Sequence, residues 1–199
     1  ASDVYKRQAS VTMSGGGINA KTAEITASAG ADDSLKVHQG SAGLVGGNAS
    51  YVREQVSGGV TAVVENQANV KGESVHITAK NDSSVTADAF GVAAGAVAVG
   101  AQIAKIKDAS SVVVKLENSN FVGDVKATVD RAQRLQAEAT AGYGGAVAGA
   151  GAVTEISDSG KAQATLTNVS ASGASFETAV NLHPELSVKS YAAGGALGV

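Results

Sequence analysis

The feature that most constrains this chain is an internal repeat of about 50 residues. Three similar segments end in asparagine, at Asn66, Asn118 and Asn168, so the intervals between them are 52 and 50 residues. A second motif has the same spacing, since Ile25 in EITA and Ile77 in HITA lie 52 residues apart. Periods of this length are typical of proteins that stack one structural unit on the next, and we interpret these five residues as structural repeat positions.

A tract rich in glycine and alanine recurs once in each unit. The four tracts begin at Ser41, Ala89, Ala141 and Tyr191, and the last unit is truncated. Small side chains there would let neighbouring strands approach closely. Three aromatic residues recur within or beside the tracts, and we expect them to form a stack along one edge of the fold: Phe90, Tyr143 and Tyr191.

Within each unit the local hydrophobic period is two residues, as in VTAVVE, SVHITAK and SVVVKLE. Such alternation is the pattern of a half-buried strand, and turn formers such as KND at 80–82 separate the runs. Strands that recur at a fixed spacing without helices between them predict an all-β fold, a parallel β-solenoid. If each unit holds two coils, a coil contains about 25 residues and the chain forms a rod roughly 35 to 40 Å long.

One segment, DVKATVDRAQRLQAEATA from Asp124, departs from this pattern. Its apolar residues, among them Val125, Val129 and Leu135, approximate a helical stripe. Alignment of the repeat places RLQAEAT, residues 134–140, where SVHITAK is expected to be a strand. We therefore predict a strand at 134–140, preceded by a short helical turn.

Composition limits the kinds of core and site that the chain can build. It has no cysteine, which excludes disulfide frameworks and thiolate metal sites. It has no tryptophan and few other aromatic residues, so the core is expected to be thin and built from alanine and valine. The formal net charge of −3 argues against nucleic acid or an anionic membrane as the main partner.

The first eight residues, ASDVYKRQ, stand apart from the repeat. Read back into codons, they resemble the in-frame translation of a transposase mosaic-end adapter used to prepare sequencing libraries. We therefore interpret residues 1–8 as a non-native prefix and 9–199 as a single β-solenoid domain, an uncapped internal fragment of a longer chain. The prefix is expected to lie loosely, outside the repeat of the first coil.

Recognisable motifs for catalysis and metal binding are absent from the sequence. Neither the phosphate-binding glycine motifs nor the G-x-S-x-G elbow of hydrolases occurs. His38, His76 and His183 are too far apart to form an H-x-x-x-H pair. We predict no catalytic, cofactor-binding or metal-binding residues, and no cofactor.

Two aspartates, Asp108 and Asp158, occupy equivalent positions in successive units. Val56 takes that position in the first unit, so a chemical role common to all units is not indicated. Aspartate is also common where a turn faces solvent. We therefore expect both carboxylates to lie in solvated turns.

A polysaccharide-active β-helix is the main catalytic alternative. Its two carboxyl groups would have to lie roughly 5 to 9.5 Å apart. Asp82 near Asp32, with Arg131 or Arg134 to stabilise charge, is the combination that stacked coils would bring together. The chain offers no tryptophan platform for sugar rings, so we do not favour this alternative.

A second alternative is a membrane-inserting module. The segment 89–104, AFGVAAGAVAVGAQIA, contains sixteen residues without a charge. A spanning helix needs about 20 predominantly apolar residues, usually more hydrophobic than alanine and glycine. The segment is also flanked by Asp88 and Lys105, so membrane insertion is not favoured.

The combination of GVAAGAVAVGA, SVHITA and the strands IKDASSVVVKLEN and ISDSGKAQATLTN resembles the repeat region of large secreted bacterial filamentous adhesins of the haemagglutinin and leukotoxin types. The resemblance implies a right-handed parallel β-helix that is exported and displayed on the bacterial surface. It implies a structural and adhesive shaft without enzyme activity. Its partners would be neighbouring repeats of the same longer chain and host-cell or matrix glycans or proteins.

Overall fold

The computed structural model describes residues 1–173 and 175–196, and nearly all of them lie in one parallel β-sheet. The all-β parallel solenoid predicted from the repeat is confirmed. The strands are β1 (Ser2–Ser14), β2 (Gly17–Asn19), β3 (Thr22–Glu65), β4 (Asn69–Gly145), β5 (Val147–Asp158), β6 (Lys161–Ser172) and β7 (Phe176–Ala196).

Strand register shows that one repeat unit makes one coil. Ile25 in β3 pairs with Ile77 in β4, and Val97 in β4 pairs with Val147 in β5. Each pairing is offset by one whole sequence repeat, so the prediction of two coils per unit is wrong. Polar residues such as those at 80–82 do not end a strand, because they lie within β4 and continue its ladder.

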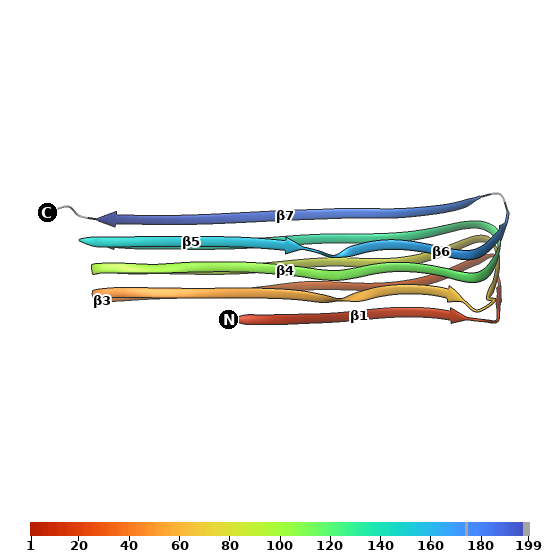
Figure 1. Cartoon of the computed structure of the whole chain (residues 1–199), viewed down its shortest axis with the longest axis horizontal. Helices are drawn as coiled ribbons and strands as arrows, with labels where there is room; N and C mark the ends of the chain where they lie inside the picture. Colours follow the sequence, from red (N-terminus) through yellow and green to blue (C-terminus); the bar gives the residue numbers. More distant parts are fainter. Residues whose placement is uncertain (174, 197–199) are drawn as a thin grey trace.

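Each coil is a flattened circuit in which the chain crosses the full width of the molecule and returns (Figure 1). An arm of about 25 residues spans about 80 Å, whereas successive coils are only about 4.8 Å apart. The chain makes about four coils, so it is much wider than it is tall. The rod predicted along the coil axis is therefore not formed. Each repeat unit makes one coil instead of two, so the stack contains half as many coils as predicted.

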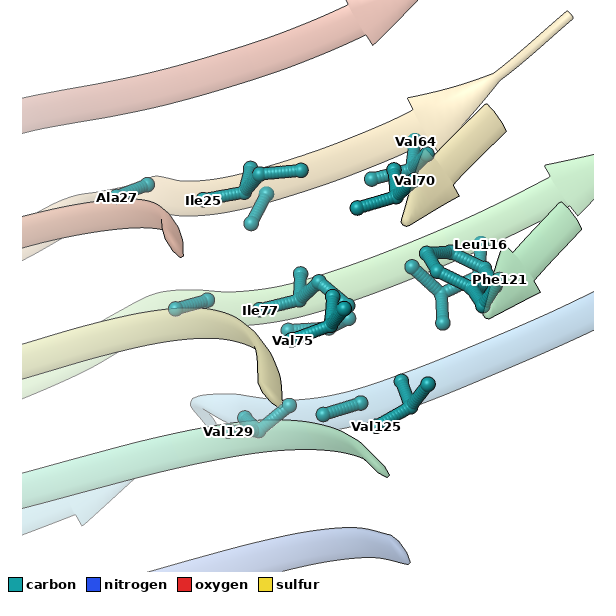
Figure 2. Packing of buried hydrophobic residues seen from close by; sticks show 14 of the residues in the cluster. Ile25, Ala27, Val64, Val70, Val75, Ile77, Leu116, Phe121, Val125 and Val129 are labelled. Carbon is teal, nitrogen blue, oxygen red and sulfur yellow. The ribbon is translucent and has the colours of Figure 1, made fainter. Parts of the chain in front are cut away.

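The core is the thin space between the two arms of each coil (Figure 2). Ile25 and Ile77 lie one above the other and are almost completely buried. Val64 and Leu116, on the returning arms, belong to the same core. Because burial of such a side chain contributes about 1.5 to 3 kcal/mol, alternating valine and isoleucine suffice to hold the arms together.

The repeated asparagines form the turns at one end of the coils. Asn66, Asn118 and Asn168 have φ angles of 57°, 44° and 52°, in the left-handed region that asparagine tolerates better than most residues. Asn168 Nδ2 donates a hydrogen bond to Asn118 Oδ1 at 3.1 Å, and Asn66 Nδ2 donates to Ser14 Oγ at 2.7 Å. The repeat therefore preserves the turn, and the side chains of two of its asparagines are hydrogen-bonded on successive coils.

The glycine- and alanine-rich tracts form the opposite end of the coils. Gly43 pairs with Gly95, and Gly145 lies against the carbonyl oxygen of Gly95. A Cβ atom at Gly95 would collide with the carbonyl oxygen of Gly43. Glycine is required here because backbones of successive coils approach too closely for a side chain.

Residues 124–145 are strand throughout, so the predicted helical turn is wrong. Val125 and Val129 both point into the core beside Val75, as an alternating strand requires (Figure 2). Leu135 pairs with Leu186 and shares a cluster with Val85. The strand predicted at 134–140 is confirmed, but it does not stack on SVHITAK as the sequence alignment suggested.

The first eight residues join the sheet. Residues 2–8 of β1 pair in parallel with residues 53–59 of β3, and the amino group of Ala1 donates to the carbonyl oxygen of Tyr51 at 2.6 Å. The expectation that they lie loosely outside the coil is wrong. Ladder hydrogen bonds use only the backbone, so an exposed parallel edge accepts an extended segment of almost any composition.

Surface ion pairs connect successive coils. Lys105 Nζ lies 2.6 Å from Glu155 Oε2, and Lys126 Nζ lies 3.2 Å from Glu177 Oε1. Exposed pairs of this kind contribute little stability individually. They do not fix the register, because the native pairing also places Arg53 directly opposite Lys105.

Candidate functional site

The most extensive polar cluster in the interior surrounds Arg131, which is 4% exposed. Its Nη1 donates to Asp158 Oδ2 at 3.0 Å, and its Nη2 donates to Asp158 Oδ1 at 2.5 Å and to Asp108 Oδ2 at 3.4 Å. Asp108 and Asp158 are paired in register on adjacent coils. One guanidinium therefore bridges two carboxylates, with the fork geometry that suits arginine.

Strand alternation directs the Asp108 side chain inward, and Asx hydrogen bonds hold both aspartates. Asp108 Oδ1 accepts a hydrogen bond from the Ser110 N–H at 2.7 Å, and Asp158 Oδ1 accepts one from the Gly160 N–H at 2.9 Å. These are Asx turns, which hold the backbone through the aspartate side chain. A Cβ atom at Gly160 would collide with the Arg131 guanidinium, so glycine leaves room for it.

The prediction of solvated turns is wrong for Asp108, whose side chain is completely buried. Burial raises the pKa of Asp108, although the hydrogen bonds from Ser110 and the charge of Arg131 act in the opposite direction. Burial also raises the pKa of Asp158, but hydrogen bonds from Arg131 and the Gly160 N–H outweigh it and the net pKa is lowered. The cluster is a structural crosslink between coils rather than an exposed reactive site.

A second polar cluster surrounds Tyr143. Its hydroxyl donates to Asn48 Oδ1 at 2.7 Å, and Gln102 Nε2 donates to the Tyr143 hydroxyl at 2.9 Å. Gln102 Nε2 also donates to Asn48 Oδ1 at 2.8 Å. Three coils thus each contribute one side chain to a buried network near the glycine-rich end.

The predicted aromatic stack is not formed. Tyr143 points into the core, whereas Tyr191 is 58% exposed and pairs with Thr140. Phe90 is tilted against His38, with ring centroids 5.5 Å apart. The three aromatic residues recur at similar but unequal positions, and a shift of one residue reverses the face to which a strand side chain points.

Asp32, Asp82 and Arg134 line one shallow hollow on the outer surface. The structure therefore brings together three of the four residues named in the carbohydrate-active alternative. Arg131 is not among them, because it is committed to the buried cluster. Arg134 Nε also lies 3.3 Å from Glu185 Oε2, which compensates its charge.

The three histidines lie apart on the surface or near it. His38 Nε2 is 3.3 Å from Asp88 Oδ2, His76 Nε2 is 2.8 Å from Ser74 Oγ, and His183 Nε2 is 3.9 Å from Asp130 Oδ1. Within residues 1–173 and 175–196 no group of ligands contains a histidine. This arrangement agrees with separate local roles for the imidazoles.

Sequence analysis missed an acidic group inside the first coil. Asp3, Asp33 and Glu54 each offer a carboxylate oxygen, and these oxygens lie within 4.8 Å of one another. Glu54 is completely buried, and burial raises its pKa to about 7, with Asp33 and Asp3 adding to the effect. The cluster could have been found by comparing equivalent positions of successive repeats, since Glu54 pairs with Ile106 in the next coil.

Comparison with protein-family models, curated proteins and solved structures finds no match to this chain. The fold alone assigns the chain to a class of protein, the parallel β-solenoids, with one coil per repeat. In the part of the chain that the structure describes, no helix is long and apolar enough to cross a membrane.

Proposed function

We propose that this chain is a shaft segment of a large secreted bacterial adhesin, with a structural and adhesive role at the cell surface. The observation that carries the proposal is the continuous parallel pairing of successive coils, at offsets of 52, 50 and 51 residues that each correspond to one sequence repeat. Each coil depends only on its neighbours, so a shaft of this design lengthens by adding coils.

The last strand supports neighbouring repeats of the same chain as the immediate partners. Leu186 and Val188 of β7 continue the inward-facing columns of Leu135 and Ala137, which are buried. Leu186 and Val188 are nevertheless 55% and 53% exposed. Opposing arms of the kind that cover Leu135 and Ala137 would cover them, and a further coil would continue the β7 ladder.

The outer surface supports a role in display rather than nucleic-acid binding. Its charges form mixed pairs between coils, such as Lys21 with Glu73, and the net charge is −3. We propose host-cell or matrix glycans or proteins as the further partners and a right-handed coil, as in the adhesins that the sequence resembles. No catalytic step and no cofactor belong to this proposal.

Duplicating one coil tests the shaft directly. Residues 66–117 form one complete circuit, and a second copy inserted after residue 117 should fold as an additional coil. We expect an unchanged strand-type circular dichroism spectrum per residue, cooperative unfolding and an increase in particle height of about 4.8 Å. A soluble aggregate or a disordered insert would contradict the proposal.

Adhesion is tested separately with the complete reading frame. Further copies of the repeat unit together with an export signal, and surface labelling of intact cells, would support display. Binding of the purified shaft to immobilised matrix proteins or glycans, compared with a β-solenoid of unrelated sequence, tests adhesion. A cytoplasmic protein without further repeats would refute the proposed role.

A further inference from the structure

We propose that Asp33 and Glu54, together with Asp3 of the eight-residue prefix, bind a calcium ion inside the first coil, a site that the proposed shaft function does not require. Two of these residues replace apolar residues of the core columns. Glu54 takes the position held by Ile106 and Ile156 in later coils, and Asp33 takes the position of Val85. Carboxyl groups at positions otherwise filled by isoleucine and valine are stabilised either by protonation or by a compensating cation.

The Asp33 carboxyl group is a hydrogen-bond partner of Glu54 only when one of the two is protonated, so it does not neutralise a pair of carboxylates. Among the described residues, no hydrogen-bond donor contacts Glu54 Oε1, Glu54 Oε2 or Asp33 Oδ2, and all three atoms are buried. The nearby arginines are directed elsewhere. Arg53 Nη2 donates to Gln55 Oε1 at 3.4 Å, and Arg7 Nη1 donates to the carbonyl oxygen of Gly30. Buried charged groups without partners are costly, which points to a bound cation.

The geometry and the donor set favour calcium. The three carboxylates offer only hard oxygen ligands, with no nitrogen or sulfur to select zinc or copper. Oxygens on opposite sides of a calcium ion lie about 4.6 to 5.2 Å apart, which accommodates a cluster spread over 4.8 Å. Magnesium requires shorter contacts and regular octahedral geometry, so this loose set fits it less well.

Access and proton exchange are also consistent with cation binding. Asp3 is exposed, so an ion enters from the open side of the first coil, and water completes its coordination. Carboxylates bind calcium only in the deprotonated form, so calcium affinity should rise with pH.

The test is calcium binding by the full chain, measured by isothermal titration calorimetry and thermal unfolding after treatment with EDTA. We expect one calcium ion per chain, a rise in the melting temperature at pH 8, and a smaller response to magnesium. Both calcium effects should be lost in Glu54→Gln and Asp33→Asn. Asp32→Asn is the matched control, because this exposed neighbour lies outside the cluster and its variant should keep the response.

Two further variants keep the test decisive. Glu54→Ile restores the residue type of the column and should fold stably without responding to calcium. Asp3→Asn removes only the exposed ligand, so binding should weaken but persist through Asp33 and Glu54. Calcium binding retained in Glu54→Gln would overturn the proposal. A wild-type chain that binds no calcium and becomes more stable only as pH falls would also overturn it, in favour of a proton shared between Asp33 and Glu54.

Discussion

Substituting Arg131 by methionine removes the cation between two buried carboxylates while keeping a side chain of similar length. In the native chain the guanidinium contacts Asp158 at 2.5 and 3.0 Å and Asp108 at 3.4 Å. The Asp108 side chain is 0% exposed, so water cannot compensate its charge, whereas that of Asp158 is 16% exposed. The variant therefore leaves two like charges facing each other in the core.

Breaking a buried pair by removing one partner costs about 3 to 5 kcal/mol of unfolding free energy. The first coil has an apolar residue at this position, because Val56 pairs with Asp108. The triple variant Arg131→Met, Asp108→Val, Asp158→Val removes all three charges. Replacing a buried ion cluster by apolar residues of similar size is often neutral or stabilising by about 1 to 4 kcal/mol, so the triple variant should recover most of the loss.

Urea unfolding followed by circular dichroism measures both variants. Arg131 lowers the pKa of Asp158 in the folded state, so this aspartate stabilises the native chain above its unfolded pKa, and the contribution is lost as pH falls. Without Arg131 both folded-state pKa values rise, and the single variant should regain stability on acidification. A loss below about 1 kcal/mol, or a triple variant as unstable as the single one, would refute this account of the core.

The remaining predictions concern turns, glycines, Glu54 and the outer hollow. Asn118→Val should cost about 1 to 2 kcal/mol in urea unfolding, because a β-branched residue at a φ of 44° is strained, whereas Asn118→Gly should cost less. Gly95→Val should cost about 1 to 3 kcal/mol or prevent folding, while Gly144→Ala, with open space around its Cβ position, is tolerated. With calcium absent, stability should fall as pH rises from about 4.5 to about 7, since burial raises the folded-state pKa of Glu54, and Glu54→Gln should abolish this dependence. The protein should release no reducing sugar from acidic polysaccharides; release that disappears in Asp82→Ala would establish catalysis at the outer hollow.

The repeat predicted much of the backbone arrangement. The pairing of Ile25 with Ile77 follows directly from their equivalent places in EITA and HITA. The positive φ of Asn66 and its equivalents explains why asparagine recurs at the turn. Coil length was misjudged because polar residues at 80–82 resemble a turn, although the outer face of a strand accepts the same residues.

Contacts between the two arms of a coil were harder to predict from the sequence. Arg131 meets Asp108 and Asp158 across the interior, and nothing in the local pattern distinguishes these aspartates from solvated ones. The stripe of Val125 and Val129 fits a helix or a strand, and only the neighbouring coil decides between them. Glu54 becomes unusual only when it is compared with Ile106 in the same column.

The flat circuit, in which one coil takes up one whole repeat, has a mechanical consequence. Tension along the stacking axis would be resisted by the ladder hydrogen bonds between two neighbouring coils, which are spread over arms about 80 Å long, and we expect the coils to separate one at a time. Once the hydrogen bonds between that coil and its neighbour break, the released coil can extend by about 170 Å, the contour length of about 50 residues. In the proposed role as a shaft under tension, the protein would therefore unfold in large, evenly spaced steps, and each step would dissipate work while the coils beneath remain intact.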